Sequence, residues 1–236
     1  MIERRRFYRE VSVQAEPRGT GYAVLLDGKV MKAPAGADFS VPTRVLADAV
    51  AEEWRSQDGK LRPETMLLTR LCNTALDRVR QNRNAAIEQV LAFGGSDLVC
   101  YRADMPAELV RRQAEAWDPL LDWLTGRHGI ELRTGAEIAF IQQSSNALAG
   151  LKEVISTLDD FHLAGLHAAT TLMGSLVIAL ALMECRLDVE QAFGAALVDD
   201  IYQEERWGRD EEMSAKTAAK KRELSEISRF IELLAQ

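Results

Sequence analysis

The sequence has few of the residues on which metal sites and small secreted domains depend. Its 236 residues include three histidines, six prolines and three cysteines, and only 6% are aromatic. The cysteines, Cys72, Cys100 and Cys185, are far apart and form no C-x-x-C pair. An odd number at this spacing argues against a disulfide framework and a zinc site, and it favours a reducing compartment.

The chain also lacks a long hydrophobic run and a basic patch. Its longest apolar stretch, residues 172–183, has twelve residues, whereas a helix needs about 20 to span a bilayer. The first residues, MIERRRFYREVSV, do not contain the apolar core of a secretory signal peptide. The net charge is −7 and the basic run of Arg4, Arg5, Arg6 and Arg9 is short, which argues against nucleic-acid binding. We therefore expect a cytoplasmic protein without membrane insertion or nucleic-acid partners.

What the sequence does contain is a concentration of acidic residues near its end. Residues 197–212, LVDDIYQEERWGRDEE, hold seven Asp and Glu residues and only two Arg residues. A continuous helix would place five residues on one face: Val189, Phe193, Leu197, Asp200 and Glu204. Because an unpaired buried charge is costly, we expect Asp200 and Glu204 to be paired with cations, bound to a metal or exposed.

Strand-forming residues are concentrated in the first forty positions. Residues 7–16 and 22–34 are rich in β-branched and aromatic side chains. The second stretch contains Asp27-Gly28, and Asp-Gly between apolar runs is a strong signal for a hairpin turn. Residues 39–41 can add a further strand. We therefore predict a small sheet.

The remainder of the sequence is mostly helical in pattern. A first helix is predicted after Thr43, ending near Asp58, and apolar residues at helical spacing continue from residue 63 onward. A strand meander followed by helices predicts the α+β fold class. We expect a small strand-rich α+β domain over residues 1–88 and an orthogonal α-helical bundle over residues 89–236.

Three local features refine this prediction. Pro119 cannot continue a helix from the preceding turn and Asp118 is a good N-cap, so Trp117 and Trp123 are expected on successive or kinked helices. Residues 172–183 predict one buried helix with Ser175 inside it. The segment GGSD, residues 94–97, predicts the end of a helix and a turn.

Motifs that would indicate catalysis are scarce. The sequence has no G-x-S-x-G elbow and no phosphate-binding loop. Asp159 and His162 have the spacing of two metal ligands on a helix, but they stand alone. We expect no catalytic residue, no metal and no cofactor. The alternative is a carboxylate- or metal-dependent enzyme built around Asp200 and Glu204, and a third possibility is an adaptor for some other basic protein.

From about Phe7 to Gly208 the sequence resembles the assembly chaperones of the F-type ATP synthase, which hold the alpha subunit of its catalytic head. Six segments in the same order carry the resemblance: RFYREVSV, YAVLLDGKVMKAP, TRLCNTALD, GSDLVCYRA, WDPLLDW and YQEERWG.

The resemblance implies a chaperone that is not an enzyme. Members of the family occur in mitochondria and alphaproteobacteria and combine a small α+β domain with an orthogonal helical bundle. They bind the unassembled alpha subunit and prevent its aggregation until the beta subunit replaces them, without a small-molecule substrate. Because no mitochondrial presequence is evident, we expect a bacterial, cytoplasmic member.

The resemblance also implies where the partner binds. Acidic residues just before the YQ…WG element are important in the family, and they correspond here to Asp199 and Asp200, with Trp207 and Gly208 closing the motif. Together with Glu204 on the predicted helix face, these residues are the expected partner-binding site. Mitochondrial members tend to carry further aromatic and His residues after the Trp-Gly pair, whereas this chain continues RDEEMSAKT, so no role is carried over beyond Gly208.

Overall fold

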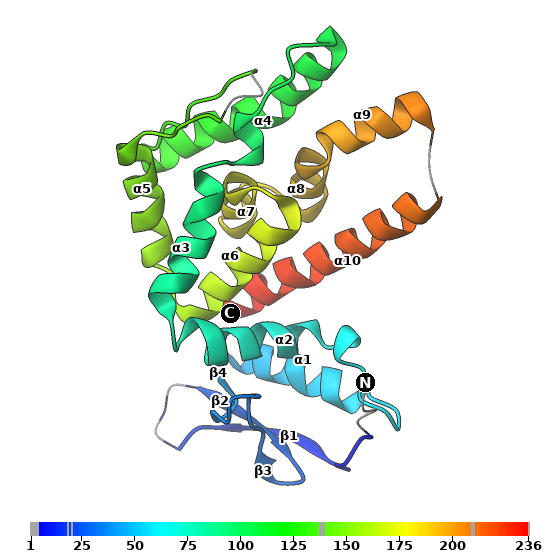
Figure 1. Ribbon diagram of the computed structural model, residues 1–236. Coiled ribbons are helices and arrows are strands. Elements are labelled where there is room, and N and C mark those ends of the chain that lie inside the picture. Colours follow the sequence, from blue (N-terminus) through cyan, green and yellow to red (C-terminus); the bar gives the residue numbers. More distant parts are fainter. Residues whose placement is uncertain (1–4, 18, 20, 137–139, 209–210, 236) are drawn as a thin grey trace. The chain divides into compact units, whose positions relative to one another are not determined.

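In the computed structural model (Figure 1), the first part of the chain forms the predicted antiparallel sheet. Strand β2 lies at its centre and pairs with each of the other three strands. The strands are β1 (Val11–Ala15), β2 (Tyr22–Leu26), β3 (Lys29–Val30) and β4 (Ser40–Val41). Asp27 and Gly28 both adopt positive φ, 49° and 77°, as the tight turn between β2 and β3 requires. The predicted hairpin is confirmed.

The structure describes residues 5–17, 19, 21–136, 140–208 and 211–235. The chain divides into two compact units. The sheet unit comprises residues 1–83, 160–165 and 226–236, and the helical unit comprises residues 84–159 and 166–225. The predicted domains, residues 1–88 and 89–236, stay a prediction, because these compact units do not show whether either part is an independent domain.

Helix α1 (Arg44–Arg55) packs against strands β1 and β2 of the sheet. The side chain of Thr43 caps its first turn by accepting from the Leu46 N–H at 3.3 Å. Leu46 and Val50 are fully buried. The predicted helix after Thr43 is therefore confirmed.

Helix α2 (Leu67–Asn73) follows the short 3-10 turn η1 (Pro63–Thr65) and continues into the π-helical turn η2 (Thr74–Val79). The carboxylate of Glu53 on α1 accepts from the Leu68 and Thr69 N–H groups at 2.8 Å. These bonds satisfy donors that the start of a helix leaves without partners.

The rest of the chain is helical, so the α+β fold class is confirmed. Helices α6 and α10 contribute residues to both units. The elements are α3 (Arg83–Gly94), the 3-10 turn η3 (Leu98–Cys100), α4 (Ala107–His128), α5 (Ser145–Ser156), α6 (Asp160–Met173), α7 (Leu176–Met183), α8 (Val189–Ala196), α9 (Val198–Trp207) and α10 (Glu211–Leu234). Helix α3 ends at Gly94, in agreement with the helix end and turn predicted there. No helix among the described residues is long and apolar enough to cross a membrane.

Of the two alternatives at Pro119, successive helices are excluded and a kinked helix stays a prediction. Helix α4 runs through this residue, and Asp118 caps nothing but pairs with the Arg102 guanidinium at 2.8 Å. A proline within a helix removes one backbone hydrogen bond. Trp117, Leu120 and Leu124 are nevertheless all buried on this helix, and burial of these large side chains outweighs the local cost.

The apolar stretch at residues 172–183 is two helices, not one. Gly174 adopts a φ of 71°, which ends α6, and the side chain of Ser175 caps α7 by accepting from the Ile178 N–H. Every residue from Leu176 to Leu182 is buried. The stretch resembles a single helix in sequence because nearly all of its residues are apolar. A hydrophobic pattern without polar positions does not reveal the turn between two buried helices.

Candidate partner-binding site

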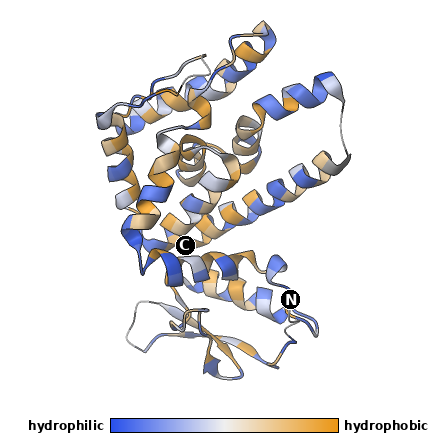
Figure 2. Ribbon diagram, in the orientation of Figure 1, coloured by the Kyte–Doolittle hydropathy of each residue, from blue (hydrophilic) through white to orange (hydrophobic). Residues whose placement is uncertain are grey.

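The acidic segment forms α9, which is separated from α8 by a break at Leu197. The backbone of this residue has φ −116° and ψ 19°, outside the helical range. The prediction of one continuous helical face from Val189 to Glu204 is therefore wrong. In Figure 2 hydrophilic residues predominate on α9.

The inward face of α9 packs on α4 through Val198 and Tyr202, which are both buried. The Arg112 guanidinium lies 5.5 Å from the centre of the Tyr202 ring and also forms a 2.8 Å ion pair with Glu205. Arg206 lies 5.1 Å from the same ring. Cation–π contacts and an ion pair thus add to the apolar packing that fixes the orientation of α9.

The predicted site residue Asp199 is directed toward α4. Its carboxylate accepts a hydrogen bond from Gln113 Nε2 at 2.7 Å. Gln113 is only 2% exposed, and its Oε1 accepts from the Ala103 N–H at 2.8 Å. The buried amide therefore connects α9 with the segment that precedes α4.

The outward face of α9 carries the other predicted residues. Asp200 is exposed, Glu204 is half-buried and Trp207 is 78% exposed. Gly208 ends the helix with φ 91°, and its N–H donates to the Glu204 carbonyl at 3.0 Å. A positive φ is strained for residues with a Cβ, so glycine suits this exit from the helix.

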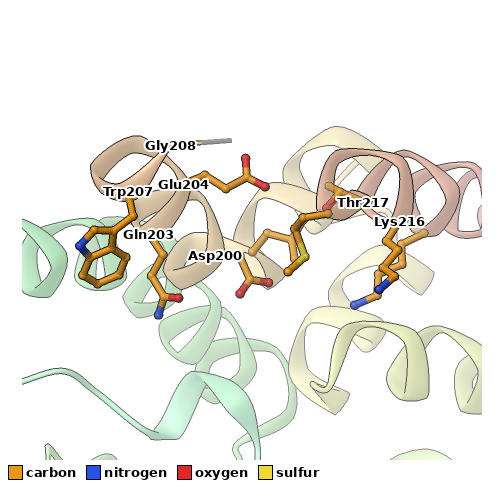
Figure 3. Close-up of a pocket in the computed structure, with 10 residues that line it drawn as sticks. Asp200, Gln203, Glu204, Trp207, Gly208, Lys216 and Thr217 are labelled. Atoms are coloured by element: carbon orange, nitrogen blue, oxygen red, sulfur yellow. The ribbon is translucent and has the colours of Figure 1, made fainter. Parts of the chain in front are cut away.

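This face of α9 forms one wall of a groove in the helical unit, and α10 forms the other wall (Figure 3). The groove has a volume of about 260 Å³. Its lining is Leu197, Asp200, Gln203, Glu204, Trp207, Gly208, Met213, Lys216, Thr217 and Lys220. The structure thus brings four of the five predicted residues to one groove and places Asp199 outside it. The α10 wall was not predicted, because no local pattern connects it with α9.

The described residues contain no cluster of ligands that would support the metal hypothesis. Among these, no three His, Cys, Asp or Glu side chains are placed to hold a metal ion. The neighbouring Asp160 forms ion pairs with Arg80 and Arg83 at 3.4 and 2.8 Å. An enzyme built around Asp200 and Glu204 stays a hypothesis.

A second carboxylate site was missed from the sequence. Asp97 is fully buried, and its oxygens accept from the Leu176 N–H at 2.7 Å, the Val177 N–H at 3.1 Å and Ser175 Oγ at 2.6 Å. The Val99 N–H donates a fourth bond at 3.2 Å. The carboxylate thus satisfies the N-terminus of α7, where helix-end donors and the helix dipole favour a negative charge.

Burial and hydrogen bonding act on Asp97 in opposite directions. Removal from water raises the pKa of its carboxyl group, the four hydrogen bonds lower it, and the net result is a pKa of about 6 against an ordinary 3.8. The segment GGSD contains this residue, but Ser175 lies 78 positions away. No motif in a single sequence could reveal that contact.

Comparison with known proteins supplies the family. The sequence model of the ATP12 chaperone protein family matches residues 5–125. Protein atp12 of Schizosaccharomyces pombe mitochondria is 23% identical over 216 residues, which cover 86% of this chain and 74% of that protein.

Solved structures agree over nearly the whole chain. The crystal structure of Atp12 from Paracoccus denitrificans is 38% identical, with a TM-score of 0.91 over 98% of both chains. A putative chaperone from Agrobacterium tumefaciens is 35% identical, with a TM-score of 0.92 over 98% of this chain and 86% of its own. The resemblance seen in the sequence is confirmed, and the chain belongs to the ATP12 chaperone family, the chaperones of ATP synthase assembly.

Proposed function

We propose that this protein binds the unassembled alpha subunit of the ATP synthase catalytic head and prevents its aggregation until the beta subunit replaces it. The observation that carries the proposal is an exposed tryptophan beside carboxylates on α9. Trp207 is 78% exposed and lines the groove together with Asp200 and Glu204. A free subunit of a larger assembly exposes an apolar interface that favours wrong association.

Each predicted residue has a role in this proposal. Trp207 supplies the apolar anchor, because tryptophan is enriched among residues that dominate interface energies. Asp200 and Glu204 orient a basic region of the alpha subunit and speed its encounter. Asp199 and Gly208 act indirectly, by holding α9 on α4 and by setting its exit.

Release requires only that the beta subunit compete for the same surface of the alpha subunit. The proposal therefore needs no nucleotide hydrolysis, cofactor, metal or small-molecule substrate, and we propose that the protein is not an enzyme. We place it in the cytoplasm of an alphaproteobacterium, in line with the relatives from Paracoccus denitrificans and Agrobacterium tumefaciens.

The direct test combines purified protein with isolated alpha subunit and measures binding and aggregation by light scattering. We expect the protein to suppress aggregation and the beta subunit to displace it. The matched variants are Asp200→Ala and Asp122→Ala, because both aspartates are exposed on helices of the helical unit but only Asp200 lines the groove. Asp200→Ala should weaken binding and leave the melting temperature within a few degrees, while Asp122→Ala should change neither. Absence of binding by the unaltered protein would refute the proposal.

A further inference from the structure

The groove presents charges of opposite sign on its two walls. Asp200 and Glu204 lie four residues apart on α9, and Lys216 and Lys220 lie four residues apart on α10. Like charges at this spacing face the same side of a helix and destabilise it. Each wall therefore carries two like charges on one side of its helix. Figure 3 shows Asp200 and Lys216 at the space between the two helices.

Two charges just outside the groove form ion pairs within the chain. On α9, Glu205 pairs with Arg112 at 2.8 Å, and on α10, Lys221 pairs with Glu190 at 2.6 Å. In the described part of the chain, Asp200 and Lys220 form no ion pair. Ion pairing within the chain thus occupies the neighbouring charges and leaves these two available to a ligand.

Apolar side chains also line the groove. Leu197 and Trp207 contribute from the α9 side, and Met213, which is 51% exposed, contributes from α10. A volume of about 260 Å³ is below the usual range for drug-sized ligands, roughly 300–1,000 Å³. The space suits one or two apolar side chains of a protein partner.

We propose that the lysine wall of α10 is the second half of the partner site, and that the groove takes an amphipathic helix of the alpha subunit with basic residues along one flank and acidic residues along the other. The inference rests on the proposed function. A helix repeats its side chains every four residues, about 6 Å along its axis, which is the spacing of the charges on both walls. An apolar stripe between the flanks would contact the apolar side chains that line the groove, as in other helix-in-groove complexes.

The test is the affinity of the full-length protein for isolated alpha subunit, measured by titration calorimetry for Lys220→Glu and Arg222→Glu. Both residues are exposed on α10 and each substitution changes the net charge by −2, but only Lys220 lines the groove. We expect Lys220→Glu to weaken binding about tenfold and Arg222→Glu to change it less than twofold. The difference should shrink at high salt, because screening weakens exposed charge interactions.

Two results would overturn the inference. A partner that is basic on both flanks would bind Lys220→Glu more tightly than the unaltered protein, because the groove would gain a negative charge. Equal affinities of the two variants would show that the α10 wall is not in contact. Either result leaves the proposed function standing, provided that the unaltered protein binds the alpha subunit. If the unaltered protein does not bind, both the inference and the proposed function are refuted. Circular dichroism melting of each variant verifies that it is folded.

Discussion

Two aspartates of the helical unit have opposite surroundings. Asp97 is fully buried and accepts four hydrogen bonds at the start of α7, whereas Asp200 is exposed at a groove and makes no ion pair among the described residues. A carboxylate inside a protein must be satisfied by the chain itself. A carboxylate at a groove can remain available to another molecule. The same residue type therefore holds the fold together at one position and is proposed to bind a partner at the other.

The largest effect should come from removing the buried carboxylate. Asp97→Ala leaves the N–H groups of Leu176 and Val177 without partners in a dry environment, so we expect a loss of about 3–5 kcal/mol in the free energy of unfolding. Urea denaturation measures it. Asp97→Asn should cost less, because its amide oxygen can still accept. A loss of under about 1 kcal/mol for Asp97→Ala would remove the contrast with Asp200.

The pH dependence of stability sharpens the same contrast. Because the pKa of Asp97 is about 6 in the folded protein and ordinarily 3.8, the folded state binds more protons between these pH values. The part of the unfolding free energy that depends on protonation of Asp97 is full below pH 4. It is lost as the pH rises through 6, and the total loss is about 3 kcal/mol.

The measurement is the unfolding free energy of the unaltered protein minus that of Asp97→Asn, obtained by urea denaturation from pH 4.5 to 7.5. The difference should fall as the pH rises and level off above about 7. A difference that rises with pH would mean that the hydrogen bonds outweigh burial and that the pKa is lowered.

Removal of the exposed tryptophan should affect binding without affecting stability. We expect Trp207→Ala to weaken binding of the alpha subunit by about 2 kcal/mol, or roughly 30-fold, and to change the unfolding free energy by less than about 0.5 kcal/mol. Phe140→Ala is the matched control, because Phe140 is 71% exposed in the helical unit and does not line the groove. Equal binding losses in the two variants would make Trp207 an ordinary surface residue.

The smallest effect concerns the support of α9. Gln113→Met removes both the donor to Asp199 and the acceptor of the Ala103 N–H, and should cost about 1–2 kcal/mol of stability. Asp199→Ala should cost about 1 kcal/mol or less, and the double variant should lose less than the sum because the two residues share one hydrogen bond. Urea denaturation of the four proteins gives the coupling energy. Strictly additive losses would show that Asp199 is not held by Gln113.

Much of the fold could be predicted because its signals are local. The Asp27-Gly28 turn, the helix after Thr43 and the helix end at Gly94 depend on residues a few positions apart. The predicted continuity through Ser175 and the alternative of two successive helices at Pro119 were wrong for one reason. At both positions the packing of distant side chains decided where a helix begins or continues.

The sequence by itself determined the α+β class, the acidic character of α9 and, through its resemblance to other proteins, the chaperone family. Only the tertiary structure distinguished the surroundings of Asp199 from those of Asp200. Adjacent side chains on a helix point in different directions, and the packing of Tyr202 against α4 decides which of the two faces inward. The tertiary structure alone placed the lysines of α10 opposite the acids of α9 and joined Asp97 to Ser175 across 78 positions. Such contacts depend on how helices pack, and a local pattern of residues does not encode that packing.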